Sequence, residues 1–429
     1  MMKNTKVYTL LMTAAVLFAS GVYAETINSI SQVEETALLN NLDYRRAVLE
    51  VKKAEDGLED ILKINNSSLS LSSTYGSENN FQWRTAADLP LFEQISISAS
   101  LDQDMKGTVG FNFNLLSHSV KVKTSRLDYE QKRAAAKETA ETIAKASIKS
   151  YLDWSAAKTD LDILGRTAAL KEDAYNDEKI RYEKGESVLD DVRSAFTAWS
   201  ESRAAVITAK NSLLDLEKTL YLNLGIDPQN STILSVEMDS LYTCISGLET
   251  ELKSAEYSVT GRYAVINAQI EAEKSETVYK NTWLFDPQLL IGGALSISPN
   301  TMYPETSITA SVSFGYDSWN KEKQEERKAA LEINRREKTQ IRNSEQLSLQ
   351  QAMVSAENSD INCSIAETEM EQAKELLEEA RFQYTQGEYS SLELEETVIQ
   401  YSQSQNNIFK ALATRYMALR TLKTYAVQK

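Results

Sequence analysis

Two long blocks of this chain contain no proline, residues 120–222 and 320–429. Both are rich in Ala, Glu, Lys, Leu and Gln, which are the strongest helix formers. From about residue 120 to Tyr182 the first block would form a single helix roughly 90 Å long, because an α-helix rises about 1.5 Å per residue. A compact globular domain has no use for such a helix, whereas a long tube or a coiled-coil rod does.

The two blocks are related in sequence. When Gly185 is aligned with Gly387, the segment "YEKGESVLDDV" falls on "YTQGEYSSLEL", and Tyr182 meets Tyr384. Before each glycine the same alignment, without a gap, preserves apolar residues at alternating steps of three and four. That spacing keeps one apolar seam of a helix against a neighbouring helix. The chain is therefore predicted to contain two tandem copies of one structural repeat.

The five prolines all lie outside the two blocks and mark the rest of the organisation. We expect a signal peptide at 1–24, a first repeat at 25–225, a linker at 226–239 and a second repeat at 240–429. In the first repeat, strands are expected at about 68–116 and long helices at about 120–222; in the second, strands at about 288–316 and long helices at about 320–427.

The N-terminus has the features of a secretory signal peptide. Lys3 and Lys6 precede the apolar run "LLMTAAVLFAS", and the small residues of "VYA" form a cleavage site before Glu25. No cysteine follows that site directly, so an N-terminal lipid anchor is not expected. No later apolar run approaches the roughly 20 residues that a membrane-spanning helix needs.

Charge and rare residue types exclude several function classes. The chain has 62 acidic and 46 basic side chains, and two of the basic ones lie in the signal peptide, which leaves a net charge near −18. Nucleic acid is excluded as a partner, because phosphate binding needs a basic surface. His118 is the only histidine, so no metal, cofactor or Ser-His-Asp triad is expected. Cys244 and Cys363 are expected to be free thiols, although the sequence alone leaves a disulfide open.

Between the helices of each copy, apolar residues alternate with Ser, Thr or small residues. Alternation over about nine positions is typical of a transmembrane β-strand. A half-buried sheet of a soluble protein shows the same pattern and is, for any single strand, the more common cause. The membrane interpretation is favoured because the segments occur at the same place in both copies. The segments are "SLSLSSTY" (68–75), "QISISASL" (94–101), "TVGFNFNLL" (108–116), "LLIGGALSI" (289–297) and "TSITASVSF" (306–314).

These features together resemble the TolC-like outer-membrane efflux protein family (outer membrane factors) over nearly all of the mature chain. The most specific shared feature is the repeated pattern Tyr-x-x-Gly-x-x-x-x-x-[Asp/Glu]-[Val/Leu]. The helix–strands–helix order, the signal peptide and "LGIDP" at 224–228 support it. The resemblance implies a mostly α-helical homotrimer with a membrane β-barrel part. Each chain would give four strands to a 12-stranded barrel and long helices to an α-helical barrel in the periplasm.

The number of strands is where the residues depart from the family. Open sheet edges are not stable in lipid and eight strands is the usual minimum for a barrel, so a chain with four must share its barrel with other chains. The first copy offers three clear strands, although a segment that returns to the side it left needs an even number. Either one of them is no barrel strand, or the weaker "NFQWRTA" (80–86) makes a fourth. The preferred interpretation takes 68–75 as one strand, with 95–116 supplying the rest or an extra extracellular loop.

Each glycine of the repeated pattern is expected where one long helix ends and the next begins. Glycine permits the left-handed backbone of a helix C-terminus, and Ser187 or Ser390 would cap the helix that follows. The acids after them would lie in the first helical turn, where the helix dipole favours negative charge. Capping alone accounts for these residue types, so a structural and a functional interpretation stay open.

The resemblance implies that these turns form a gate. Carried over by position, Tyr384 is the gate tyrosine and Asp191 is its hydrogen-bond partner. The family's gate arginine is replaced here by Tyr389, which favours a gate held by hydrogen bonds and packing. Glu393 and Glu396 fall where two acidic rings of the pore are expected, and a ring of like charges would raise the pKa of these carboxyl groups.

Gly185 and Gly387 are the implied contact positions for a periplasmic adaptor protein, since small residues let two backbones approach closely. The implied function is a passive, porin-like exit duct of a tripartite efflux or type I secretion system. It would lie in the outer membrane, contact its lipid, and extend into the periplasm. An adaptor (membrane fusion) protein and an inner-membrane pump of RND, ABC or MFS type would open it.

Two other classes are weighed against the channel. A periplasmic coiled-coil structural or spacer protein explains the helical seams but not the paired strand segments. An enzyme that uses Asp190, Asp191 or Glu393 is least favoured, because acid pairs are frequent on solvated helices and no substrate cleft is evident. The exported substrate and the class of pump do not follow from the sequence.

Overall fold

The computed structural model describes residues 25–62, 68–75, 81–92, 95–102, 107–114, 118–229, 231–281, 287–298, 301–314 and 321–427. The chain forms two compact units. Unit 1 comprises Met1–Arg45, Thr139–Val259 and Gln346–Lys429, and unit 2 comprises Arg46–Glu138 and Thr260–Glu345. Each unit therefore draws on both predicted repeats. The predicted signal peptide lies outside the described residues.

Two helices of 66 residues each, α4 (His118–Glu183) and α8 (Lys321–Gln386), agree with the length expected from the proline-free blocks. Each is followed after a short turn by a second long helix, α5 (Leu189–Leu224) or α9 (Ser391–Lys423). The other helices are α2 (Ile30–Asn40), α3 (Leu42–Leu62), α6 (Met238–Lys253), α7 (Tyr263–Asn281) and the short 3-10 helix η1 (Val259–Gly261).

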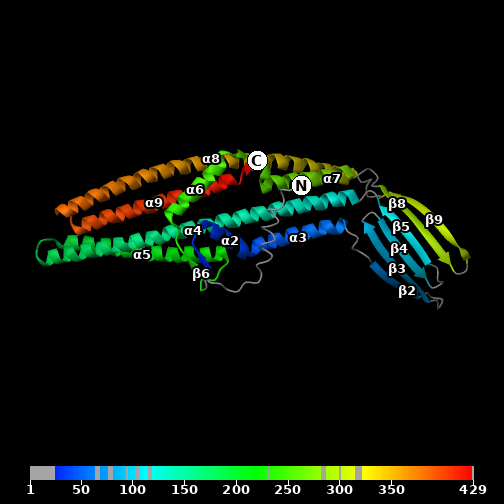
Figure 1. Cartoon of the computed structure of the whole chain (residues 1–429), viewed down its shortest axis with the longest axis horizontal. Helices are drawn as coiled ribbons and strands as arrows, with labels where there is room; N and C mark the ends of the chain where they lie inside the picture. The colour runs from blue at the N-terminus through cyan, green and yellow to red at the C-terminus, as the bar shows by residue number, and fades with distance from the viewer. Residues whose placement is uncertain are drawn as a thin grey trace. The chain divides into compact units, whose positions relative to one another are not determined.

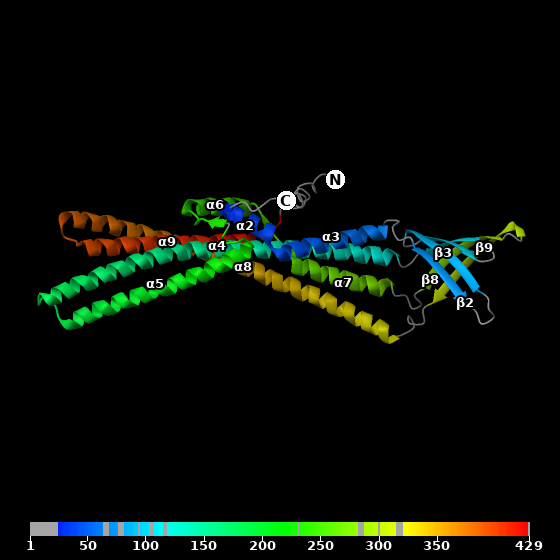
Figure 2. The ribbon, with the colours of Figure 1, turned by 90° about the horizontal axis from the view of Figure 1, so that it is seen from below.

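In unit 1, α4 and α5 form one helical hairpin, and α8 and α9 form another (Figures 1 and 2). The two turns lie at the same end of this unit. Apolar side chains hold α4 against α9: Ile163 and Leu170 are buried with Ile399, and Leu392 packs against them. Burying an aliphatic side chain of this size stabilises the fold by roughly 1.5–3 kcal/mol.

A buried polar contact joins the same two helices. Asn406 of α9 is only 3% exposed, and its amide donates to the backbone oxygen of Ala156 at 3.2 Å and to Asp160 Oδ1 at 2.6 Å. Lys410 Nζ lies 2.7 Å from Asp160 Oδ2. Because a buried amide left without partners is costly, these bonds favour one alignment of α4 against α9.

Aromatic rings join α4 to α5. Tyr175 stacks on Trp199 with 5.5 Å between the ring centroids and 6° between the planes. Phe196 meets both rings edge-on at 5.5 and 5.9 Å, and the guanidinium of Arg203 lies 5.2 Å from the Trp199 ring. Each such contact adds roughly 0.5–1.5 kcal/mol beyond the area that it buries. The first hairpin is therefore held together by side chains of its own.

Short strands complete unit 1. β1 (Glu25–Ile27) pairs in parallel with β6 (Ser231–Ile233), and β7 (Glu256–Tyr257) pairs antiparallel with β10 (Ala426–Val427). Around them α2 packs on α5, and α6 packs on α9. Tyr151 of α4 is fully buried, and its hydroxyl donates to the backbone oxygen of Leu234 at 2.7 Å. This burial raises the pKa of Tyr151 to about 12.

Unit 2 contains a six-stranded sheet in the order β2–β3–β4–β5–β8–β9, in which every neighbouring pair is antiparallel. The first repeat gives four of these strands and the second repeat gives two. The strands are β2 (Ser68–Tyr75), β3 (Phe81–Phe92), β4 (Ile95–Asp102), β5 (Gly107–Asn114), β8 (Pro287–Ser298) and β9 (Thr301–Phe314).

The sheet has six strands, two more than the four per chain that the resemblance implies. From Phe81 onward, the weak segment "NFQWRTA" forms the start of β3, a strand of 12 residues. The strand is hard to recognise from sequence because Pro90, a residue that is rare within strands, lies near its end. Beside Pro90 the register between β3 and β4 shifts. Pairing with β2 on one side and β4 on the other supplies the ladder bonds that residue pattern alone does not predict.

Two further expectations concern the helices and the thiols. Within the part of the chain that the structure describes, no helix is both long and apolar enough to cross a membrane. Cys363 is buried and Cys244 is partly buried, and both are free thiols, as expected. Burial raises the pKa of each thiol.

Candidate functional site

Gly185 ends the turn after α4 with a left-handed backbone, at a φ of +77°. Its N–H donates to the backbone oxygen of Tyr182 at 2.9 Å, and the N–H of Glu186 donates to that of Arg181, also at 2.9 Å. This pair of bonds is the Schellman motif, which satisfies the last carbonyl groups of a helix.

Gly387 repeats this geometry after α8. Its φ is +78°, its N–H donates to the backbone oxygen of Tyr384 at 3.1 Å, and the N–H of Glu388 donates to that of Gln383 at 3.0 Å. Nothing described lies within 4 Å of where a Cβ would stand at either glycine. Glycine is therefore needed for its backbone conformation, and both turns are open on the chain's surface.

Ser390 caps the helix that follows Gly387. Its hydroxyl accepts from the N–H of Glu393 at 3.3 Å, while the carboxylate of Glu393 accepts from the N–H of Ser390 at 2.7 Å. This reciprocal capping box satisfies two backbone donors at the start of α9. The hydrogen bonds from the backbone and hydroxyl of Ser390 lower the pKa of Glu393 in the single chain, opposite to the rise expected for a ring of like charges.

The first turn of α5 is built differently. Val188 is its N-cap residue and makes no side-chain cap, so the expectation that Ser187 would cap this helix is wrong. The hydroxyl of Ser187 instead lies within hydrogen-bonding distance of Glu178 on α4 and 3.2 Å from Asp191 Oδ2 on α5. The reason is that α5 begins one residue too late for Ser187 to be its N-cap.

The residues of the predicted gate lie near the two turns but are not joined to one another. Tyr384 and Tyr389 flank Gly387 and are 45% and 36% exposed. Asp191 lies in the first turn of α5 and Glu396 in the second turn of α9, and both are exposed. In the described parts of this single chain, Tyr384 and Asp191 form no hydrogen bond with each other, and Ser187 is the contact of the Asp191 carboxylate.

Two stripes of exposed apolar side chains were not singled out in the sequence. Along α8, consecutive members of the stripe are 7, 7, 4 and 11 residues apart. These spacings are close to whole turns of an α-helix, so the members share one face of the helix. The α5 stripe has steps of eleven and seven. The exposed fractions are 48–61%, and the residues are Leu347, Val354, Ile361, Ile365 and Leu376 on α8, and Phe196, Ile207 and Leu214 on α5. Their regular spacing is the signal that would have identified them.

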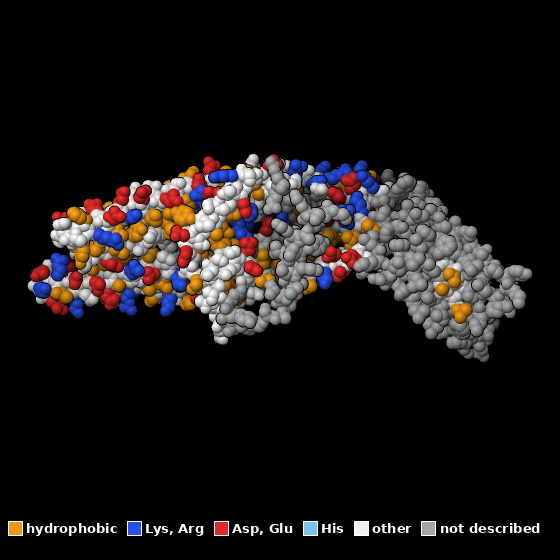
Figure 3. Space-filling view, viewed as in Figure 1, with side chains coloured by type: hydrophobic (Ala, Val, Ile, Leu, Met, Phe, Trp, Pro, Cys, Tyr) orange, Lys and Arg blue, Asp and Glu red, His pale blue; other side chains and the backbone are white. Residues whose placement is uncertain are grey.

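The stripes lie on the outer helices of unit 1, since α4 and α9 run between α5 and α8 (Figure 1). In space-filling view, apolar side chains are visible between interspersed acidic and basic ones over these hairpins (Figure 3). Exposed apolar rows of this length mark surfaces that pack against another helix.

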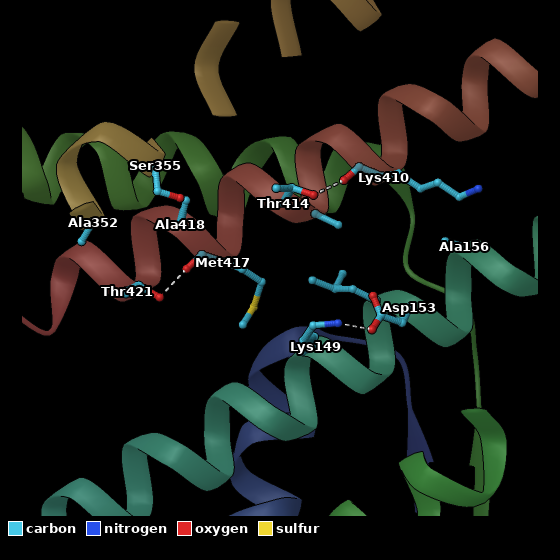
Figure 4. A pocket seen from close by; sticks show the side chains of 12 residues that line it. Lys149, Asp153, Ala156, Ala352, Ser355, Lys410, Thr414, Met417, Ala418 and Thr421 are labelled. Carbon is cyan, nitrogen blue, oxygen red and sulfur yellow. Dashed lines mark hydrogen bonds and ion pairs between the residues drawn. The ribbon is translucent and has the colours of Figure 1, made fainter. Parts of the chain in front are cut away.

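A cleft of about 390 Å³ lies between α4, α8 and α9 in unit 1 (Figure 4). Lys149 and Asp153, which both lie on α4, pair with each other at its edge at 2.6 Å. The hydroxyl of Thr414 is already bonded to the backbone oxygen of Lys410 at 2.8 Å. Alanine and leucine side chains supply much of the remaining lining, so the cleft has the chemistry of a packing groove between helices. In the described residues, no group of three or more His, Cys, Asp and Glu side chains is arranged to hold a metal ion.

No protein-family model matches the sequence, and no curated protein matches it. Solved structures do match. CusC, solved in a study of its folding and transmembrane channel formation, is 14% identical, covers 95% of both chains and has a TM-score of 0.63. The outer membrane channel CmeC of Campylobacter jejuni is 11% identical over 92% of this chain and 85% of its own, with a TM-score of 0.61.

The outer membrane protein VceC of Vibrio cholerae is 13% identical over 91% of this chain and 95% of its own, with a TM-score of 0.61. At such low identity the likeness concerns the fold, and it extends over nearly the whole of each chain. The repeated glycine pattern, the paired helical hairpins and these matches lead to one conclusion: this chain has the fold of the TolC-like outer-membrane efflux channels.

Proposed function

We propose that this protein is a passive exit duct of the outer membrane, assembled as a homotrimer and extending into the periplasm. The observation that carries the proposal is the pair of apolar stripes on α5 and α8, on a chain with the fold of outer-membrane channels. A single chain leaves both rows in water. In a ring of copies, α8 of one chain lies beside α5 of the next, and each stripe is covered by the other.

The sheet of unit 2 is proposed to enter the outer membrane. Leu101 and Val109 are 39% and 52% exposed, and Ala99 is exposed as well. Ala99 of β4 pairs directly with Val109 of β5, and Leu101 lies two residues after Ala99 in β4. Because alternate residues of a strand point to the same side, the three share one face of the sheet. An exposed apolar face suits contact with lipid.

The turns after α4 and α8 are proposed as the periplasmic gate. In the closed trimer, the hydroxyl of Tyr384 donates to Asp191, and the two residues come from different hairpins of unit 1. Tyr389 packs nearby in place of the family's arginine. Glu396 has no partner among the described residues of the single chain and is the better placed of the two ring acids. Glu393 would have to leave its capping box to face the pore.

The same two turns are proposed as the contact sites for partner proteins. The free space around Gly185 and Gly387 supports a docking role for the hairpin tips of an adaptor protein. An inner-membrane pump of RND, ABC or MFS type would supply the energy for export. We propose no enzymatic activity for this protein.

Membrane fractionation and planar-bilayer recording test this function. We expect a heat-modifiable oligomer in the outer membrane that forms low-conductance pores. Combining Tyr384→Phe with Asp191→Ala should raise the conductance, whereas Tyr182→Phe, at the matching position of the first turn, should not. Equal conductance of the double variant and the wild type would reject the gate.

The acidic rings have a separate test. Changing Glu396 and Glu393 to Gln should reduce cation preference and weaken block by multivalent cations, because a carboxylate ring concentrates cations at a constriction. Unaltered selectivity would show that these acids do not line the pore. A soluble, elongated oligomer in the periplasm would reject the channel altogether and favour the coiled-coil spacer.

A further inference from the structure

The six-stranded sheet of unit 2 has two edges that pair with no other described strand. β2 pairs with β3 alone and β9 pairs with β8 alone within the described residues. The backbone N–H and C=O groups along such edges need partners, and in lipid no water is present to supply them.

One chain cannot remove these edges by itself. Barrels in bacterial outer membranes have eight or more strands, and this sheet has six. Two other occupants are disfavoured by the described structure. The short strands β1, β6, β7 and β10 are already paired among themselves in unit 1, and the remaining long elements are helices. A second copy of the chain is therefore the occupant that fits the edges.

The strand directions make the two edges complementary. Every neighbouring pair in the sheet is antiparallel, so β3, β5 and β9 run in one direction, and β2, β4 and β8 in the other. If β2 of a second copy lies beside β9, the alternation continues across the boundary between chains. This holds only because the number of strands per chain is even. The same contact repeated around an axis closes into a ring.

We propose that each chain contributes all six strands to one shared antiparallel barrel, with β9 of each chain paired to β2 of the next. This inference rests on the proposed function, which supplies the three copies, and it makes the barrel 18-stranded. Four strands per chain would give 12.

The wider barrel has a consequence for transport. Barrel diameter grows roughly in proportion to strand number, so 18 strands give a backbone diameter about 1.5 times that of 12. Barrels of about 16–18 strands leave an aqueous channel. The sheet would then place little restriction on what passes, and selection would fall to the helical turns.

Cysteine cross-linking in the full-length protein tests which strand lies beside β9. Ala310→Cys or Thr306→Cys in β9 is combined with a cysteine at each position of β2 in turn. The competing pair combines Ala310→Cys with Ser98→Cys in β4, because a four-strand arrangement without β2 and β3 would place β4 at the edge. The wild-type chain controls for Cys244 and Cys363, and the single variants control for β9 contacting itself.

We expect oxidised samples to give covalent dimers and trimers in SDS for at least one β2 position, and none with β4. A ladder with β4 would overturn the proposal in favour of four strands. Cross-links confined within one chain, or no ladder at any β2 position in a trimer that still reaches the outer membrane, would also overturn it. A chain absent from the outer membrane fails in fractionation, so failure of the proposed function is distinguishable.

Discussion

Replacing Gly387 by alanine isolates the backbone requirement of the turn between α8 and α9. The φ of +78° lies in the left-handed region, and no described atom lies within 4 Å of the added Cβ. Packing therefore contributes nothing to the expected change. What remains is the conformational energy of the turn itself.

The magnitude follows from two opposing terms. A residue with a Cβ costs roughly 1–2 kcal/mol in the left-handed conformation. Alanine also lowers the conformational entropy of the unfolded chain, which stabilises the folded state by about 0.4–1 kcal/mol. We therefore expect Gly387→Ala to destabilise the turn by about 1 kcal/mol, which corresponds to roughly a fivefold increase in the open population.

Hydrogen exchange of the purified oligomer measures this opening directly. The amide of Glu388 is the reporter, because it donates to the backbone oxygen of Gln383 at 3.0 Å and is freed when the Schellman motif opens. We expect its protection to fall about fivefold in Gly387→Ala. Amides far along α8 and α9 should be unchanged.

Two other glycines supply matched controls. Gly165 lies within α4, has no positive φ and has open space at its Cβ position, so Gly165→Ala should stabilise its helix by about 0.5–1 kcal/mol. Gly225 has a φ of +64°, and its Cβ would lie 3.0 Å from Cβ of Asn40, so Gly225→Ala should cost more than Gly387→Ala. If Gly387→Ala and Gly165→Ala shift protection in the same direction, the argument from backbone conformation is refuted.

Three further outcomes test other contacts. The pKa of Glu393 in the folded chain is lowered from its ordinary 4.5, so its carboxylate stabilises the start of α9 above about pH 4.5 and loses that effect as the pH falls further. The difference in melting temperature between wild type and Glu393→Ala should therefore shrink between about pH 6 and pH 3.5. A constant difference would contradict the capping box. Asn406→Ala should lower the unfolding free energy by about 1–3 kcal/mol in denaturant titrations, because it removes two buried hydrogen bonds, whereas exposed Asn407→Ala should change it little. Ile361→Glu, in the middle of the α8 stripe, should shift the oligomer towards monomer in analytical ultracentrifugation while the helix content is unchanged. Glu371→Ala, at another exposed position of α8, should leave the oligomer intact. A stable trimer of Ile361→Glu would show that the stripe is not part of the interface.

The turns illustrate how far local sequence reaches. Glycine at a helix end, followed by serine and then an acid three residues on, predicts a left-handed residue and a cap. Both features are present, the first at Gly387 and the second at Ser390 with Glu393. At Ser187 the same reasoning fails. The bonds of that hydroxyl go to Glu178 and Asp191, and α5 begins too late for it to act as the cap.

The gate residues show a different limit. Position in the repeated pattern places Tyr384, Asp191 and Glu396 near the turns, but whether they meet depends on how hairpins and neighbouring chains pack. Glu393 is the clearest case, because a side chain expected to face a pore is bonded to its own helix in the single chain. The bond between Ser390 and Glu393 spans three residues of one helix, so it forms without any partner chain.

By itself, the sequence determined the long helices, the repeat and the left-handed turns, because helix propensity, a steady apolar spacing and glycine's backbone freedom act within a few residues of the chain. Only the tertiary structure decided that α4 packs on α9 through Asn406 and Asp160, that β3 belongs to the sheet, and that the sheet has six strands. These depend on ladder bonds and buried contacts between residues far apart in the chain. A short pattern with a proline near its end carries no information about the strands that will lie on either side of it.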